Sequence, residues 1–237
     1  MWKALTADSI FPYALLGMTV VTGIIDAVSF LSLGHVFTAN MTGNIVLLAF
    51  ASTGVPQVSL ARSITALLGF RAGAAVGGRI MAGASAVVQL RAASSVFALE
   101  IVFLVGATLA ALGYGVVSPP HLLRLYAMIA CSAIAMGMRN AAVRKLALPD
   151  LTTTVLTLTI TGLAADSSLA RGTNPRLQRR IAAVVAMFAG AALGSIALRH
   201  SIVMALAFSV LLSSLCTLAL LISSRLPCAR NTETNRA

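Results

Sequence analysis

The chain has 237 residues, of which 59% are hydrophobic and only 10% are charged, and its mean hydropathy is +0.95. A soluble domain carries about 25% charged residues, so this composition excludes a water-soluble globular protein and predicts an integral membrane protein. The net charge of +11 would suggest nucleic acid as a partner in a soluble protein. Here most of the 17 Lys and Arg residues stand between apolar runs, so we expect the lipid bilayer as the partner and no nucleic-acid binding.

A short amphipathic lead-in, residues 1–10, is followed by eight apolar runs, and residues 225–237 read as a polar, disordered tail. Most runs approach the roughly 20 residues that a transmembrane helix needs. Frequent Gly and Ala suit closely packed helices better than a β-barrel, so the predicted fold is all-α. The runs cover residues 11–34, 37–53, 62–86, 94–117, 122–143, 151–169, 179–198 and 201–224.

The two halves of the chain resemble each other, which indicates an internal duplication. Residues 23–27, Gly-Ile-Ile-Asp-Ala, align with residues 137–141, Gly-Met-Arg-Asn-Ala, at a shift of 114. Residues 72–77 align with 189–194 at a shift of 117. We therefore expect two pseudo-symmetric transmembrane repeats in one membrane domain. The repeats cover residues 11–117 and 122–224.

Two topologies are open, and they differ in how runs 37–53 and 151–169 are treated. If all eight runs span, each half has four helices and both halves insert with the same orientation. If these two runs re-enter the membrane, each half has three spans and the halves are inverted. We prefer eight spans, for which ten Lys and Arg residues fall on the inner side and six on the outer side.

Polar residues gather where the first run ends and the second begins. Asp26 lies inside the first run, and Asn40, Thr42, Gly43 and Asn44 open the second. Such groups cost several kcal/mol when they face lipid, so they must face protein, water or a ligand. Asp26 is interpreted either as a proton or cation site or as half of a salt bridge between helices. The other four either contact a ligand or cap a helix and bond to its neighbours.

Further charged and polar candidates lie in later runs. Arg71, near the middle of the third run, needs a carboxylate, an anion or water. We expect Asp26 as its partner and Glu100 as a second carboxylate, unless Glu100 reaches the headgroup region. The second half offers an uncharged counterpart in Asn140 and in a Thr-rich segment that includes Thr154.

Metal and catalytic motifs are missing from the sequence. The three His and three Cys residues share no metal-ligand spacing, so we expect neither a metal nor another cofactor. No Ser-His-Asp set, HExxH motif or Walker loop occurs, and we expect no enzyme.

The stretch from Asp26 to Asn44 resembles the signature of the YoaK-like family, whose members are small bacterial integral membrane proteins of unknown function. Asp26-Ala27, Phe30-Leu31, Leu33-Gly34, Val36-Phe37 and Ala39 to Asn44 carry the resemblance. Residues 137–141 and the Thr-Gly segment that follows are also similar, except that Arg139 stands where the family pattern has Gln. The resemblance covers essentially the whole chain and implies the bacterial cytoplasmic membrane, but no substrate or reaction.

Three functions are compatible with these observations. The preferred one is a small transporter or permease whose halves meet at a midplane site. That site would be built from Asp26, Asn40, Thr42, Asn44, Arg71 and Asn140. The alternatives are an intramembrane enzyme acting on a lipid or polyprenyl substrate and a membrane scaffold that transports nothing. The oligomeric state and the identity of any small-molecule or ion substrate are open.

Overall fold

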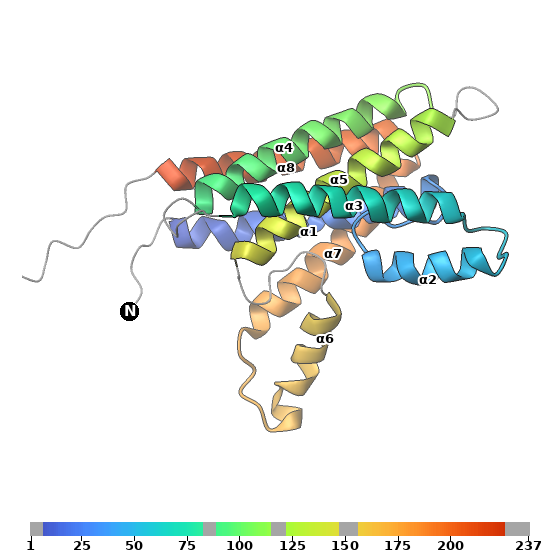
Figure 1. Ribbon diagram of the computed structural model, residues 1–237. Helices are drawn as coiled ribbons and strands as arrows, with labels where there is room; N and C mark the ends of the chain where they lie inside the picture. Colours follow the sequence, from blue (N-terminus) through green and yellow to red (C-terminus); the bar gives the residue numbers. More distant parts are fainter. Residues whose placement is uncertain (1–6, 83–88, 115–121, 147–155, 226–237) are drawn as a thin grey trace, which may run out of the picture.

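The computed structural model describes residues 7–82, 89–114, 122–146 and 156–225 (Figure 1). Over these residues it forms helices and no strand, which confirms the predicted all-α membrane bundle. The first helix begins at Ala7, inside the expected lead-in. The helices are α1 (Ala7–Ser32), α2 (Met41–Ser52), α3 (Leu60–Met81), α4 (Gln89–Ala111), α5 (Leu122–Leu146), α6 (Leu156–Ala165), the 3-10 helix η1 (Ser168–Ala170), α7 (Leu177–Leu198) and α8 (Ile202–Arg225).

Helix lengths favour six long helices over the preferred eight spans. Among the described helices, α1, α4, α5, α7 and α8 are long and apolar enough to cross a membrane. Helix α3 is as long, with 22 residues, but carries Arg62, Arg71 and Arg79. By contrast, α2 has 12 residues and the described part of α6 has 10. At 1.5 Å per residue they extend about 18 and 15 Å, which is too short for about 30 Å of hydrocarbon.

The chain between α1 and α2 folds back along α1 instead of crossing to the other side. The backbone N–H of Ala39 donates a 3.1 Å hydrogen bond to Oδ1 of Asp26, which lies six residues before the last residue of α1, Ser32. Phe37 stacks on Phe30 with ring centroids 5.0 Å apart, so the returning chain also packs on the last turns of α1. Helix α2 then runs outward beside one end of α3 (Figure 1). This is the shape of a re-entrant segment.

The two halves pack through equivalent pairs of helices. The counterparts are α1 and α5, α2 and α6, α3 and α7, and α4 and α8. Helix α1 packs on α7 and α8 of the other half, and its counterpart α5 packs on α3 and α4. Helices α1 and α5 run in opposite directions along the bundle (Figure 1). The halves are therefore intertwined and inverted relative to each other.

Close glycine contacts show the same equivalence residue by residue. A Cβ added to Gly137 of α5 would lie 2.1 Å from the carbonyl oxygen of Phe70, and one added to Gly23 of α1 would lie 2.4 Å from that of Met187. Phe70 and Met187 differ by 117 positions, the shift predicted from the sequence. Backbones can approach this closely only where the side chain is a hydrogen atom.

The reciprocal contact comes from α3 and α7. A Cβ on Gly73 would lie 2.1 Å from the carbonyl oxygen of Ile134, and one on Gly190 would lie 2.1 Å from that of Val20. The crossing of α3 with α5 and the crossing of α7 with α1 therefore use equivalent residues, shifted by 114 and 117 positions, and both hold the bundle together. They support the duplication, whose exact domain boundaries remain a prediction.

Candidate functional site

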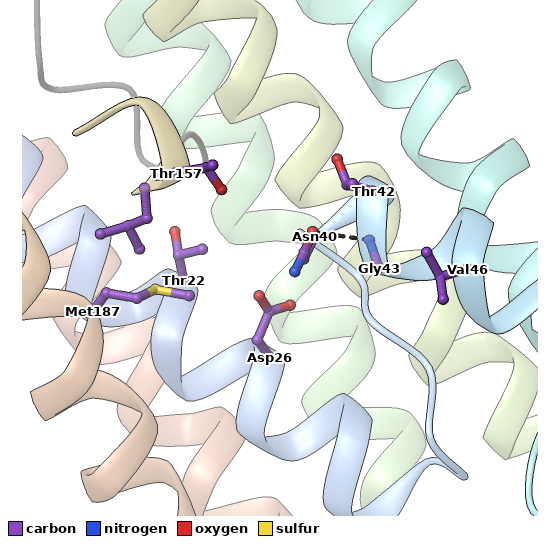
Figure 2. Close-up of a pocket in the computed structure, with 9 residues that line it drawn as sticks. Thr22, Asp26, Asn40, Thr42, Gly43, Val46, Thr157 and Met187 are labelled. Carbon is purple, nitrogen blue, oxygen red and sulfur yellow. Dashed lines mark hydrogen bonds between the residues drawn. The ribbon is translucent and has the colours of Figure 1, made fainter. Parts of the chain in front are cut away.

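A cavity of about 560 Å³ lies between the two halves beside Asp26 (Figure 2). Helix α1, the start of α2, the start of the described part of α6, and α7 all contribute to its wall. The described lining residues are Thr22, Asp26, Asn40, Thr42, Gly43, Val46, Leu156, Thr157 and Met187. Four of the predicted candidates thus meet at one cavity: Asp26, Asn40, Thr42 and Gly43.

Asp26 is only 7% exposed, and backbone amides surround its carboxylate. Besides the hydrogen bond from Ala39, the amides of Thr38 and Asn40 interact with it. The expected ion pair with Arg71 is not formed: Arg71 lies on the exposed side of α3 and does not line the cavity. Within the described ranges, Asp26 has no ion-pair partner.

Asn40 shapes the cavity wall by capping α2. Its Oδ1 accepts a 3.1 Å hydrogen bond from the N–H of Gly43, which satisfies one of the amides left without a partner at a helix start. The carboxamide nitrogen of Asn40 lies on the side that faces Asp26 (Figure 2). Asn40 therefore caps the helix and also lines the cavity, and its contact with a ligand stays a prediction.

The other candidates lie elsewhere. Asn44 is fully buried and braces the loop: its Oδ1 accepts a 2.9 Å bond from the N–H of Phe37, and its amide donates to the carbonyl of Phe37. Asn140 donates to the carbonyl of Met136 at 2.8 Å, within its own helix, and is not among the described lining residues. Thr154 lies outside the described residues.

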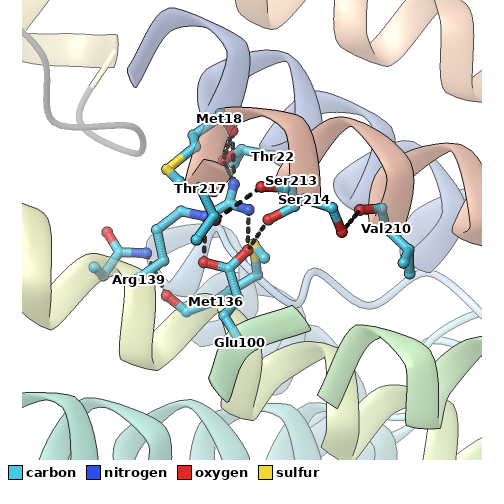
Figure 3. A network of polar contacts seen from close by, with 10 residues as sticks. Met18, Thr22, Glu100, Met136, Arg139, Val210, Ser213, Ser214 and Thr217 are labelled. Atoms are coloured by element: carbon cyan, nitrogen blue, oxygen red, sulfur yellow. Dashed lines mark hydrogen bonds and ion pairs between the residues drawn. The ribbon is translucent and has the colours of Figure 1, made fainter. Parts of the chain in front are cut away.

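A second polar cluster, which was not predicted from the sequence, is centred on Arg139 and Glu100 (Figure 3). Both side chains are 0% exposed. Nε of Arg139 donates to Oε2 of Glu100 at 3.0 Å, and Nη2 donates to Oε1. Ser213 donates to the same Oε1 at 2.9 Å. Glu100 is therefore buried inside the bundle and does not reach the headgroup region. Its partner is Arg139 and not Arg71, for which Glu100 was the second expected carboxylate.

Thr22 connects this ion pair to the cavity. Nη1 of Arg139 donates to Oγ1 of Thr22 at 3.1 Å and to the carbonyl oxygen of Met18 at 2.6 Å. Oγ1 of Thr22 donates to the same carbonyl at 3.0 Å, and Thr22 also lines the cavity. Two opposite charges inside runs four and five, Glu100 and Arg139, were the signal in the sequence for this pair.

A further ion pair joins α7 to the end of α6. Nη1 of Arg180 lies 2.7 Å from Oδ2 of Asp166 and donates to the carbonyl oxygen of Gly162 at 2.7 Å. The side chain of Asp166 is 45% exposed. The described residues contain no group of three His, Cys, Asp or Glu side chains placed to share a metal ion. The expectation of no cofactor stays a prediction.

Several long apolar helices packed into one bundle define a multi-pass membrane protein. The family model described as "Protein of unknown function (DUF1275)" matches residues 14–219, so the chain belongs to this family. It is similar to the UPF0700 transmembrane protein YoaK of Bacillus subtilis (strain 168), with 40% identity over 147 residues. That match covers 62% of this chain and 62% of the relative, less than two thirds of its length. No solved structure matches.

Proposed function

We propose that the protein is a small transporter of the bacterial cytoplasmic membrane, with its solute site in the cavity beside Asp26. The observation that carries the proposal is the position of this cavity, which is lined by α1 and α2 of one half and by α6 and α7 of the other. In inverted-repeat transporters the site lies at the repeat interface and is formed by discontinuous helices. The re-entrant tip at Ala39 and the short α2 provide such an element.

The packing of the halves supports relative movement around this site. The close backbone crossings tie α1 to α7 and α5 to α3, which makes each pair a rigid unit built from both halves. Helices α2 and α6 instead pack mainly on α3 and α7, respectively, of their own halves. Tilting one unit against the other would move the cavity walls while leaving the crossings intact, as alternating access requires.

Asp26 is the residue proposed to bind the solute or a coupling proton or cation. A carboxylate inside an apolar helix is functional by default unless a structural partner accounts for it. Glu100 has such a partner in Arg139, whereas Asp26 has only backbone donors among the described residues.

Uptake into proteoliposomes under a pH gradient tests the proposal. Wild type, Asp26→Asn and the matched control Asp166→Asn would be compared with labelled pools of amines, amino acids and sugars. We expect at least one pool to enter faster than into protein-free vesicles, with loss in Asp26→Asn and retention in Asp166→Asn. Uptake at the protein-free rate for every pool would favour a scaffold, and turnover of added lipid would favour an intramembrane enzyme.

A further inference from the structure

We propose that the cavity takes a small protonated amine whose ammonium group pairs with Asp26. This assignment deepens the proposed function and rests on it, since it names the chemical class of the solute. Three independent features carry it: the ion pairs of two other carboxylates, Glu100 and Asp166, the charge of the cavity wall and the kinds of groups that line it.

The pairing of carboxylates sets Asp26 apart. Glu100 binds Arg139, and Asp166 binds Arg180. Asp26 is almost as buried as Glu100, yet no cationic side chain in the described part of the chain pairs with it. Buried charges in proteins are normally paired, so the counter-charge of Asp26 is expected to arrive with the ligand.

The charge of the wall selects a cation over an anion. No Lys, Arg or His is among the described lining residues, and Asp26 is their one charged member. The positive start of α2 would favour an anion by itself. Two of the amides there already have acceptors: the N–H of Ala39 donates to Asp26, and that of Gly43 donates to Asn40. An anion would therefore meet a carboxylate and no donor of full positive charge.

The lining groups fit an ammonium with N–H donors on a short apolar body. Thr22, Thr42 and Thr157 offer hydroxyl oxygens, whereas Val46 and Met187 offer apolar surface. Quaternary ammonium groups are typically held by aromatic cages, and no aromatic residue occurs among the described lining residues. A cavity of about 560 Å³ is also far larger than a single inorganic cation needs and falls in the range of small-molecule sites.

Binding of three probes that share a four-carbon chain to the purified full-length protein tests the assignment. The probes are n-butylammonium, n-butanol and butyrate at about pH 7.5, where an alkylamine with a Lys-like pKa is protonated. Thermal unfolding is followed with a thiol-reactive dye, because Cys216 is buried in the folded protein. We expect saturable stabilisation by n-butylammonium, with an affinity about tenfold or more above that of n-butanol, as one charge-assisted contact provides.

Two variants locate the effect. Asp26→Asn keeps the size of the side chain and an acceptor for Ala39, and should weaken n-butylammonium binding to the level of n-butanol, whereas Asp166→Asn should bind like wild type. Should Asp26→Asn fail to fold, Thr157→Val decides instead, because this residue is exposed at the cavity wall and the variant should lose affinity several-fold.

Three results would overturn the amine assignment: equal binding of n-butanol and n-butylammonium, tighter binding of butyrate, or no stabilisation by n-butylammonium. If uptake of another solute still depends on Asp26, the transporter proposal stands and only the solute class is wrong. If no pool is taken up although n-butylammonium binds, the cavity is a binding site and the transporter proposal fails.

Discussion

Arg139 and Glu100 form a two-point ion pair between α5 and α4, with both side chains completely buried. The pair is extended by Ser213 of α8 and by Thr22 of α1, so four helices from both halves meet at one charged cluster (Figure 3). Every polar group of the pair has a protein partner, which is the condition under which a buried ion pair is tolerated. We infer that this cluster is structural and that the neighbouring cavity is functional.

Removing one member of the pair should destabilise the protein strongly. Arg139→Gln and Glu100→Gln each leave the other charge buried without a counter-ion, which typically costs about 3–5 kcal/mol. The double variant replaces the ion pair by two amides that can bond to each other, and should recover most of the loss. Unfolding temperatures of the four proteins in detergent measure this coupling. Losses that simply add in the double variant would show that the pair is not formed.

Adding a methyl group at the helix crossings should disrupt the bundle. Gly73→Ala and Gly190→Ala each place a Cβ 2.1 Å from a backbone carbonyl oxygen of the other half, which a side-chain rotation cannot relieve. Gly78→Ala is the matched control in α3, because a Cβ there has no neighbour within 4 Å. We expect low yield or a reduced unfolding temperature for the first two, and unchanged or raised stability for the control. Equal stability of Gly73→Ala and Gly78→Ala would contradict the crossing.

Arg71 should be dispensable for stability. It lies on the exposed side of α3 and forms no ion pair with Asp26 or any other described residue. Replacing it by Leu removes a charge from the middle of an apolar helix, so Arg71→Leu should match or exceed the wild-type unfolding temperature. A marked loss of stability would instead show that Arg71 has a partner, either on another chain or in a solvated groove. Size measurements of the wild type and the variant would distinguish these two cases.

The six-helix topology predicts a strong charge asymmetry. Both ends of the described chain, Ala7 and Arg225, lie at one end of the bundle (Figure 1). In this topology the 17 Lys and Arg residues divide into twelve at that end, three at the other and two inside helices, in place of the ten-to-six division of eight spans. The twelve are Lys3, Arg79, Arg91, Arg144, Lys145, Arg171, Arg176, Arg179, Arg180, Arg225, Arg230 and Arg236. Positively charged flanks stay in the cytoplasm, so this end should be cytoplasmic.

Single cysteines at position 57, between α2 and α3, and at position 173, before α7, distinguish the two topologies. In a background without Cys131, Cys216 and Cys228, an impermeant maleimide added to intact cells should label Gln57→Cys and spare Thr173→Cys. Eight spans would spare both positions. Labelling of Thr173→Cys alone would keep the six-span fold and reverse its orientation.

Much of the site was predictable because a polar group in an apolar run is conspicuous. This signal predicts Asp26, Asn40 and Thr42, with the neighbouring Gly43, and the four residues meet at one cavity. The shifts of 114 and 117 recur in the glycine contacts, which supports the predicted duplication. The role of the four cavity residues in ligand binding stays a proposal.

Partner choice and span count were not predictable from the same signals. Arg71 and Arg139 both stand inside apolar runs, and the apolar pattern does not tell which face of each helix is packed. Arg139 is 0% exposed whereas Arg71 is exposed. The apolar run of residues 37–53 suggests a span that includes residues 37–40. In the structure these four residues form the returning loop, and the helix covers only Met41–Ser52. Hydropathy reports an apolar environment, and a loop packed inside protein has one too.

Access to the cavity from both sides of the membrane tests the central claim most directly, because it needs no knowledge of the solute. A cysteine at position 42 replaces Thr42 at the cavity wall in the same cysteine-free background, and an impermeant maleimide is applied to right-side-out and to inverted vesicles. Alternating access predicts reaction from both sides, with Gln57→Cys reacting from the outer side only. Reaction of Thr42→Cys from one side only, or from neither, would contradict the transporter account.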